Sequence, residues 1–402
     1  MKVIFKDNQF SFQILRLLGG ATSGSADIGE VISTAQKIKE GDFESWCKEW
    51  TALAKRIENF AEECYSNGHL TSARQAYLRA SNYYRTAEFY LHENPNDTRI
   101  NELYNKEIHC FSYVMKLNNP VIEAVEIPYE NTNLPGHFYH IDNNPRPTLV
   151  LVNGYDGTKE EFYGLAMSAL ERGMNFFTFE GPGQGETVRK QHLFFRYDYE
   201  NVISPVLDYL LSRNEIDPNA IVLMGESFGG YLAPRAAAFD KRVAACIANG
   251  GVYDFMGFRR PSDFSREDFF AYVRNNQEEV NSINYEEMKK NPDMRWAISH
   301  GMYVSDAKTP AEFILKTENY YLKGIADKIK CPTLVIDTEN EHFFPGQAKA
   351  LYDELKCRKD FILFTKDECA EEHCQVGAKL IAGERIFNWI EDTINNHINV
   401  GL

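Results

Sequence analysis

Long apolar runs are missing from this sequence. No stretch approaches the roughly 18 consecutive apolar residues of a membrane-spanning helix. Residues 1–20 contain no uninterrupted apolar core of the kind that defines a secretory signal peptide. The eight cysteines are scattered and include no C-x-x-C pair, which argues against a disulfide framework. These absences predict a reduced, cytoplasmic protein with no membrane partner.

Excess positive charge is also missing. The formal net charge is −15, and such a field repels nucleic acids and anionic membrane surfaces. We therefore expect neither as a partner. Apolar residues make up 44% and aromatic residues 13% of the chain, which suits a large core and an aromatic-lined pocket. A length of 402 residues fits one large domain with an accessory region, or two domains.

Residues 27–118 have the pattern of amphipathic helices. Apolar side chains recur there at spacings of three and four residues, and Asn67-Gly68 and Asn94-Pro95 separate the helices. Residues 1–20 fit either a strand or a helix, and a helix that ends at Gly19 is favoured. The sequence thus predicts a helical region over residues 1–120 that packs on the chain that follows.

From about Val121 short apolar strands alternate with helices, which predicts an α/β fold with a mostly parallel sheet. The first two strands are expected to be antiparallel. Residues 252–330 interrupt this alternation and are expected to form a helical cap, so that 121–251 and 331–402 are the two parts of the core. The expected strands are 121–130, 134–142, 147–154, 174–181, 221–224, 243–251, 331–339 and 360–365. The helical pieces expected in the cap are 266–279, 284–290 and 310–322.

The stretch Gly225-Glu-Ser-Phe-Gly229 matches the G-x-S-x-G nucleophile elbow. A buried strand precedes it and a helical segment follows, which is the context that the motif requires. The tight turn strains the backbone of Ser227 and leaves no room for side chains at the two glycines. We therefore predict Ser227 as a nucleophile, with the Phe228 N–H facing a developing oxyanion.

A serine hydroxyl needs a base, and the base needs an orienting acid. In folds with this elbow the acid and then the histidine follow the serine along the chain. His373 lies in the loop after the last expected strand and is the predicted base. The predicted acid is Glu341, with Asp337 as the alternative. A metal site built from Cys369, His373 and Cys374 is a less favoured reading, because no second group of ligands accompanies this one short cluster.

A second oxyanion donor is expected from the loop after the strand 147–154. Gly154 permits close approach there, and the Tyr155 N–H is the best candidate, although an ordinary glycine-rich turn would look the same. His192, His300 and Asp254 lie in plausible pocket segments, but nothing in the sequence lifts them above structural roles.

Several motifs together resemble one branch of the α/β-hydrolases. They are GPGQGE, GESFGGYLAPRAAAFDKRV, TLVIDTENEHFFPGQAKALYDEL, EEHCQVGA and, in the cap, RWAISHGMYV. The branch contains 2,6-dihydroxypseudooxynicotine hydrolase, the fungal heptaketide hydrolase of pigment synthesis and bacterial polyketide-shortening hydrolases. The resemblance implies an α/β-hydrolase fold whose helical block and cap close over the substrate. It also implies a Ser–His–acid triad in which Ser227 and His373 match the family residues, whereas Glu341 stands where the family normally has Asp.

The resemblance implies hydrolysis of a carbon–carbon bond next to a ketone in an aromatic or polyketide β-dicarbonyl compound, including chain shortening in pigment or secondary-metabolite biosynthesis. A carboxylesterase or lactonase, and a non-catalytic regulatory protein on the same scaffold, remain open alternatives. No metal or cofactor is expected, and a homodimer is left open.

Overall fold

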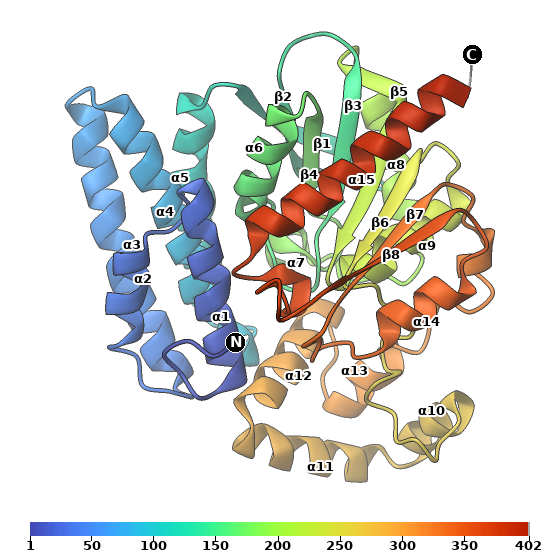
Figure 1. Ribbon diagram of the computed structural model, residues 1–402. Coiled ribbons are helices and arrows are strands. Elements are labelled where there is room, and N and C mark those ends of the chain that lie inside the picture. Colours follow the sequence, from blue (N-terminus) through green and yellow to red (C-terminus); the bar gives the residue numbers. More distant parts are fainter. Residues whose placement is uncertain (401–402) are drawn as a thin grey trace.

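An eight-stranded β-sheet forms the centre of the protein (Figure 1). The structure is a computed structural model that describes the backbone of residues 1–400 and the side chains of residues 1–394. The strands are β1 (Val121–Tyr129), β2 (Thr132–His140), β3 (Arg146–Val152), β4 (Asn175–Phe179), β5 (Ile216–Glu226), β6 (Ala245–Asn249), β7 (Thr333–Thr338) and β8 (Lys359–Phe364).

The strands lie in the order β1-β2-β4-β3-β5-β6-β7-β8. β1 and β2 form an antiparallel hairpin, and β2 is also antiparallel to β4. All other neighbours in the sheet are parallel. Parallel strands are covered on both faces, which explains the unbroken apolar runs in β3 and β5. The predicted α/β fold with a mostly parallel sheet is confirmed.

Five helices form an N-terminal block beside the sheet (Figure 1). Each of α1, α2, α3 and α5 follows an aspartate whose side chain accepts a backbone N–H of the first turn. This N-capping satisfies amides that have no partner inside the helix, so local sequence sets where these helices begin. The helices are α1 (Asn8–Gly19), α2 (Ile28–Ala35), α3 (Phe43–Ser66), α4 (Leu70–Glu88) and α5 (Thr98–Leu117), with short 3-10 turns η1 (Gly20–Ser23) and η2 (Leu91–Glu93).

The remaining core helices cover the two faces of the sheet. α6 and α15 share one hydrophobic cluster with the sheet, and α8 and α9 share the other. These helices are α6 (Tyr163–Glu171), α7 (Gly185–Lys190), α8 (Glu200–Leu211), α9 (Gly229–Phe239), α14 (Gln347–Glu354) and α15 (Lys379–Val400), with 3-10 turns η3 (Lys159–Phe162), η4 (Ala326–Lys328) and η5 (His373–Gln375). Among the described residues, no helix combines the length and apolar character needed to cross a membrane.

The N-terminal block shares its core with one face of the sheet. Leu149 and Leu151 of β3 belong to the same buried cluster as Trp46 and Trp50 of α3. Val150, the intervening residue of β3, belongs to the cluster on the opposite face. The block therefore packs on the sheet as part of one continuous apolar core.

Buried ion pairs add to this contact. Arg16 of α1 lies 3.0 Å from a carboxylate oxygen of Asp156 and 2.5 Å from one of Glu161. Glu88 of α4 lies 2.9 Å from the guanidinium of Arg189 in α7. A charge buried here without its partner would be costly, so these pairs fix how the helices of the block are seated on the core.

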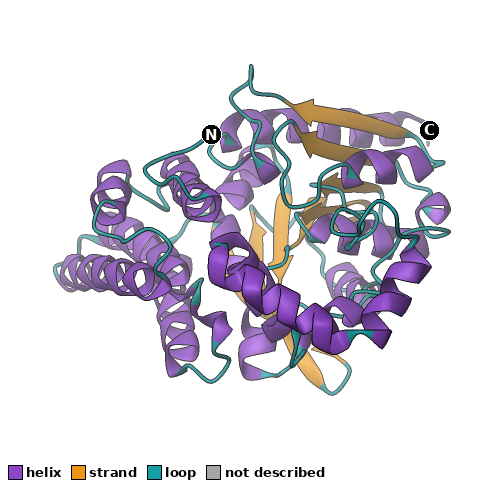
Figure 2. Ribbon diagram, turned by 90° about the horizontal axis from the view of Figure 1, so that it is seen from below, coloured by secondary structure: helices purple, strands orange, loops and turns teal. Residues whose placement is uncertain are grey.

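Four helices lie between β6 and β7 and cover the end of the sheet at which β5 terminates (Figures 1 and 2). They differ from the expected helices in two ways. The helix expected over 266–279 is interrupted at Asn276, and the helix over 292–305 was not expected. Asn291 caps that helix and Pro292 begins it, but its buried side includes His300 and Gly301 and so gives no clear apolar stripe. The helices are α10 (Arg266–Asn275), α11 (Gln277–Lys290), α12 (Pro292–Ser305) and α13 (Pro310–Lys316).

Candidate active site

Ser227 lies at the sharp turn between β5 and α9. Its backbone φ is +59°, a left-handed conformation that is costly for a residue with a side chain. A Cβ on Gly225 would lie 1.8 Å from the carbonyl oxygen of Gly229, and one on Gly229 would lie 2.3 Å from that of Val152. Only glycine fits at these two positions, so the turn requires both glycines of the G-x-S-x-G motif.

His373 lies in η5, in the loop that follows β8, and is 4% exposed. Its Nε2 atom is 2.8 Å from the Ser227 hydroxyl oxygen. Its Nδ1 atom is 2.5 Å from a carboxylate oxygen of Glu341. The structure thus brings the three residues predicted as nucleophile, base and acid into one chain of hydrogen bonds.

Glu341, and not Asp337, is the carboxylate beside His373. The other oxygen of Glu341 accepts the backbone N–H groups of Phe343 and Phe344 at 2.8 Å and 3.0 Å. Asp337 ends its strand with its carboxylate accepting the N–H of Thr338 at 2.9 Å.

The protonation of this pair follows from its surroundings. Burial alone would raise the pKa of Glu341, but His373 and the two backbone amides outweigh it and lower that pKa to about 2. Burial likewise opposes a charged imidazole, yet the contacts with Cys374 and Glu341 raise the pKa of His373 well above the ordinary 6.5. Glu341 is therefore ionised, and its charge favours the imidazolium form of His373 once the ring gains a proton.

The two backbone amides predicted as oxyanion donors have no competing acceptor. Within the described part of the chain, the N–H groups of Tyr155 and Phe228 donate to no other protein group. The loop after β3 packs tightly on the elbow, since a Cβ on Gly154 would lie 2.8 Å from the carbonyl oxygen of Glu226. The close approach expected at Gly154 is thus present in the structure.

His300 holds the loop that contains Tyr155. Its Nε2 atom is 2.8 Å from the carbonyl oxygen of Tyr155, and its Nδ1 atom is 2.9 Å from Nδ1 of His92 in η2. The Nε2 atom of His92 is 2.7 Å from Glu88, which also pairs with Arg189. A buried polar chain therefore runs from the N-terminal block through the cap to the loop beside Ser227.

The two other residues considered from the sequence lie away from this chemistry. Asp254 pairs with Arg260 and Arg266, at 3.3 Å each, and organises the start of the cap. His192 has a positive φ of 55° in the loop after α7 and is not among the residues that line the cavity at Ser227.

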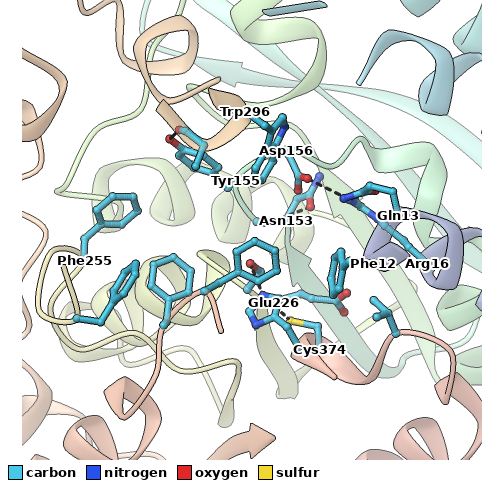
Figure 3. A pocket seen from close by; sticks show the side chains of 18 of the residues that line it. Phe12, Gln13, Arg16, Asn153, Tyr155, Asp156, Glu226, Phe255, Trp296 and Cys374 are labelled. Atoms are coloured by element: carbon cyan, nitrogen blue, oxygen red, sulfur yellow. Dashed lines mark hydrogen bonds and ion pairs between the residues drawn. The ribbon is translucent and has the colours of Figure 1, made fainter. Parts of the chain in front are cut away.

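A small aromatic cavity of about 90 Å³ opens above Ser227 and His373 (Figure 3). Arg16 and Asp156 form an ion pair at its side. A larger hollow of about 460 Å³ adjoins it, and Arg16, Phe162, Glu226 and Val376 line both. The aromatic residues that line the small cavity are Phe12, Tyr155, Phe162, Phe255, Phe258, Trp296, Phe313, Phe343 and Phe344.

Several cavity residues were not identified from the sequence. Phe12 and Arg16 come from α1, far away along the chain, and only the tertiary structure shows that this helix faces Ser227. Trp296 could have been found, because it lies in the cap motif that carries part of the family resemblance. Cys374 follows His373 directly, and its sulfur is 3.4 Å from His373 Nε2.

The side-chain contacts do not favour a metal site at His373 or at a second cluster away from it. His373 already uses both ring nitrogens for Ser227 and Glu341, and Cys369 is exposed. Among the described residues, Glu123, His140 and Glu215 bring their ligand atoms within 4.8 Å of one another. The guanidinium of Arg213 lies 2.9 Å from each of these two glutamates, so it already pairs with both and offsets part of their charge.

The sheet order, the strained serine after β5 and the helices on both faces define an α/β-hydrolase fold. Residues 147–374 match the family model described as the alpha/beta hydrolase fold. Hydrolase LUC6 of a Fusarium species is 34% identical over 423 aligned residues, which cover 98% of each protein. The chain therefore belongs to the α/β-hydrolase family.

Two further relatives fit the branch that the motifs resemble. The 20-hydroxy-prefusarin hydrolase FUS2 of Gibberella moniliformis is 33% identical, with 98% of each chain covered. The crystal structure of 2,6-dihydroxy-pseudo-oxynicotine hydrolase has a TM-score of 0.73 at 22% identity and covers 94% of this chain and 95% of that one. This structural likeness shows that the fold extends over the N-terminal block and the cap.

The elbow can be tested with a pair of glycine substitutions. Gly225→Ala should abolish hydrolysis and lower the melting temperature, because the new Cβ would overlap backbone at 1.8 Å. Gly383→Ala in α15 is the control, since a Cβ there meets nothing within 4 Å and alanine favours a helix by roughly 0.5–1 kcal/mol. Thermal unfolding and ester hydrolysis measure both. Wild-type activity in Gly225→Ala would contradict this view of the turn.

Proposed function

We propose that the protein is a serine-dependent hydrolase that cleaves a carbon–carbon bond next to a ketone in an aromatic or polyketide β-dicarbonyl substrate. The observation that carries the proposal is the hydrogen-bonded chain from Ser227 through His373 to Glu341 at the floor of an aromatic cavity. Ser227, His373 and Glu341 take the roles of nucleophile, base and orienting acid. The reaction rests on these side chains and two backbone amides and uses no cofactor.

In the first step the Ser227 oxygen attacks the ketone carbon while His373 Nε2 takes the hydroxyl proton. The ketone oxygen becomes an oxyanion, and the N–H groups of Tyr155 and Phe228 stabilise it. Glu341 accepts the hydrogen bond from Nδ1 and stabilises the imidazolium that forms. The raised pKa of His373 makes this proton transfer favourable.

In the second step the carbonyl re-forms and the adjacent carbon–carbon bond breaks, with the electron pair leaving on carbon. Such a leaving group must be delocalised as an enolate, which is why a second carbonyl at the β position is needed. His373 protonates the departing carbon and becomes neutral again. It then activates a water molecule that hydrolyses the acyl-enzyme, releasing a carboxylic acid and freeing Ser227.

Two features support this substrate class. Aromatic side chains surround the cavity and would stack on a flat conjugated substrate. The FUS2 relative is named for hydrolysis of 20-hydroxy-prefusarin.

Purified protein assayed side by side against β-diketones such as 1-phenyl-1,3-butanedione and against p-nitrophenyl esters tests the proposal. Turnover of esters alone would make the protein an esterase instead, and turnover of neither class would favour a non-catalytic role.

The nucleophile is tested by Ser227→Ala. We expect the rate to fall by roughly 10⁴- to 10⁶-fold, because no covalent intermediate can form. Folding should persist, since alanine replaces serine without new bulk, and circular dichroism checks this. Activity within about tenfold of wild type would exclude covalent catalysis by Ser227.

The acid is tested by the pH dependence of kcat/KM. The wild-type rate should rise with pH as His373 loses its proton, at a pH above its ordinary pKa of 6.5. Glu341→Gln removes the carboxylate that raises this pKa, so the rise should move to lower pH while the plateau falls by about 10³- to 10⁴-fold. Glu341→Asp should keep part of the activity.

Asp337→Asn is the matched control, and its plateau should stay near that of wild type. Severe loss in Asp337→Asn together with a wild-type profile in Glu341→Gln would reverse the assignment of the acid.

The chain of hydrogen bonds behind Tyr155 also determines which ring nitrogen of His300 carries a proton. The carbonyl of Tyr155 can only accept, so His300 Nε2 must donate and His300 Nδ1 must accept from His92. Burial and the nearby His92 lower the pKa of His300 to about 3, which agrees with a neutral ring. Glu88 is ionised, since Arg189 and His92 outweigh burial and lower its pKa to about 2, so His92 donates to it as well.

This chain of hydrogen bonds predicts that His300 positions the loop that contains Tyr155. Two substitutions that introduce the same amide group at different distances from the backbone, glutamine and asparagine, test this role. In His300→Gln the side-chain NH₂ reaches the place of Nε2 and can still donate to Tyr155, whereas in His300→Asn it reaches only the place of Nδ1. We expect kcat near wild type for glutamine and a loss of about 10²-fold for asparagine, with KM little changed in both, as when an oxyanion donor is misplaced. Equal kcat values for the two variants would contradict the role.

A further inference from the structure

Arg259 lies in the loop between β6 and α10 and lines the same small cavity as Ser227 and His373. Its guanidinium carbon lies 5.2 Å from the centre of the Phe258 ring. Its side chain makes no hydrogen bond or ion pair with any residue in the described part of the chain. The backbone N–H of Arg259 donates to the carbonyl oxygen of Met256 at 3.1 Å.

The other charged groups at the cavity are neutralised. Arg16 pairs with Asp156 and Glu161. Glu226 lies 3.1 Å from the ammonium of Lys379, and His373 pairs with Glu341. The neighbouring Arg260, by contrast with Arg259, pairs with Asp254 at 3.3 Å and is not among the cavity residues. Among the described residues that line the cavity, Arg259 is thus the one cation without a counter-charge.

A guanidinium in such a place has a clear chemical requirement. Burial lowers the pKa of Arg259, and Tyr155 is the group that acts against this. Arg259 is half-buried, so water solvates its unpaired charge only in part, and an anion that enters the cavity would offset that cost. The planar fork of arginine matches a carboxylate with two parallel hydrogen bonds, which ammonium or amide groups cannot reproduce.

We propose that Arg259 binds a carboxylate of the substrate, so that the natural substrate is a β-dicarbonyl compound carrying an acid group away from the scissile bond. The inference rests on the proposed function for the identity of the reacting bond, but not for the binding of the anion. Arg259 would hold the acid end at the cap side of the cavity while the ketone lies at Ser227. A neutral analogue of the same shape would then bind less tightly.

Benzoate and benzamide test this pairing, because they have nearly the same shape and differ in charge. Calorimetric titration of the intact protein should give binding of benzoate about tenfold or more tighter than that of benzamide, as a charge-assisted pair of hydrogen bonds requires. The preference should vanish in Arg259→Gln and be kept in part in Arg259→Lys. Arg260→Gln, the matched control, should keep the full preference.

The same titration with Ser227→Ala separates this inference from the proposed function. The carboxylate preference needs no nucleophile and should persist in that variant. Equal binding of the two probes by wild type, or a preference that survives in Arg259→Gln with circular dichroism unchanged, would overturn the role of Arg259. Failure of the protein to hydrolyse any diketone or ester would overturn the proposed reaction alone.

Discussion

The backbone strain at Ser227 is the constraint on which the site depends. Its left-handed conformation persists only because close-packed segments leave the turn no alternative. Glycines make this packing possible: besides Gly225 and Gly229, Gly250 has a φ of +75° and would place a Cβ 3.1 Å from the His373 ring. Ser227 and His373 are therefore held in place by main-chain contacts that side chains at these glycines would destroy.

The buried charges around the site are arranged as ion pairs. Nearly every buried charge near the cavity has an opposite partner from a different part of the chain, as Arg16 has in Asp156 and Glu161. Because these pairs join the N-terminal block to the loops around Ser227, the aromatic roof and the floor of the cavity are fixed relative to each other. A cavity of about 90 Å³ is too small for a whole polyketide, so a substrate of the proposed class would also have to occupy the adjoining hollow.

The sequence was sufficient for features that local chemistry dictates. The elbow glycines, the apolar runs of β3 and β5 and the aspartate caps each point to one local structure, and Glu341 could be preferred to Asp337 from loop position. Features that arise only from tertiary contact were missed. Nothing in the mixed buried face of α12 marks it as a helix, and nothing in Phe12 or Arg259 shows that either faces Ser227.

The contact between α1 and the loop after His373 has a consequence for synthesis of the protein. Gly377 packs against Leu15. A Cβ on Gly19 would lie 3.1 Å from the backbone nitrogen of Gly377. Helix α1 is made before this loop, so their contact can form only after residue 377 has left the ribosome. A nascent chain that contains Ser227 but not yet residue 377 therefore lacks both the predicted base, His373, and the loop that packs against α1.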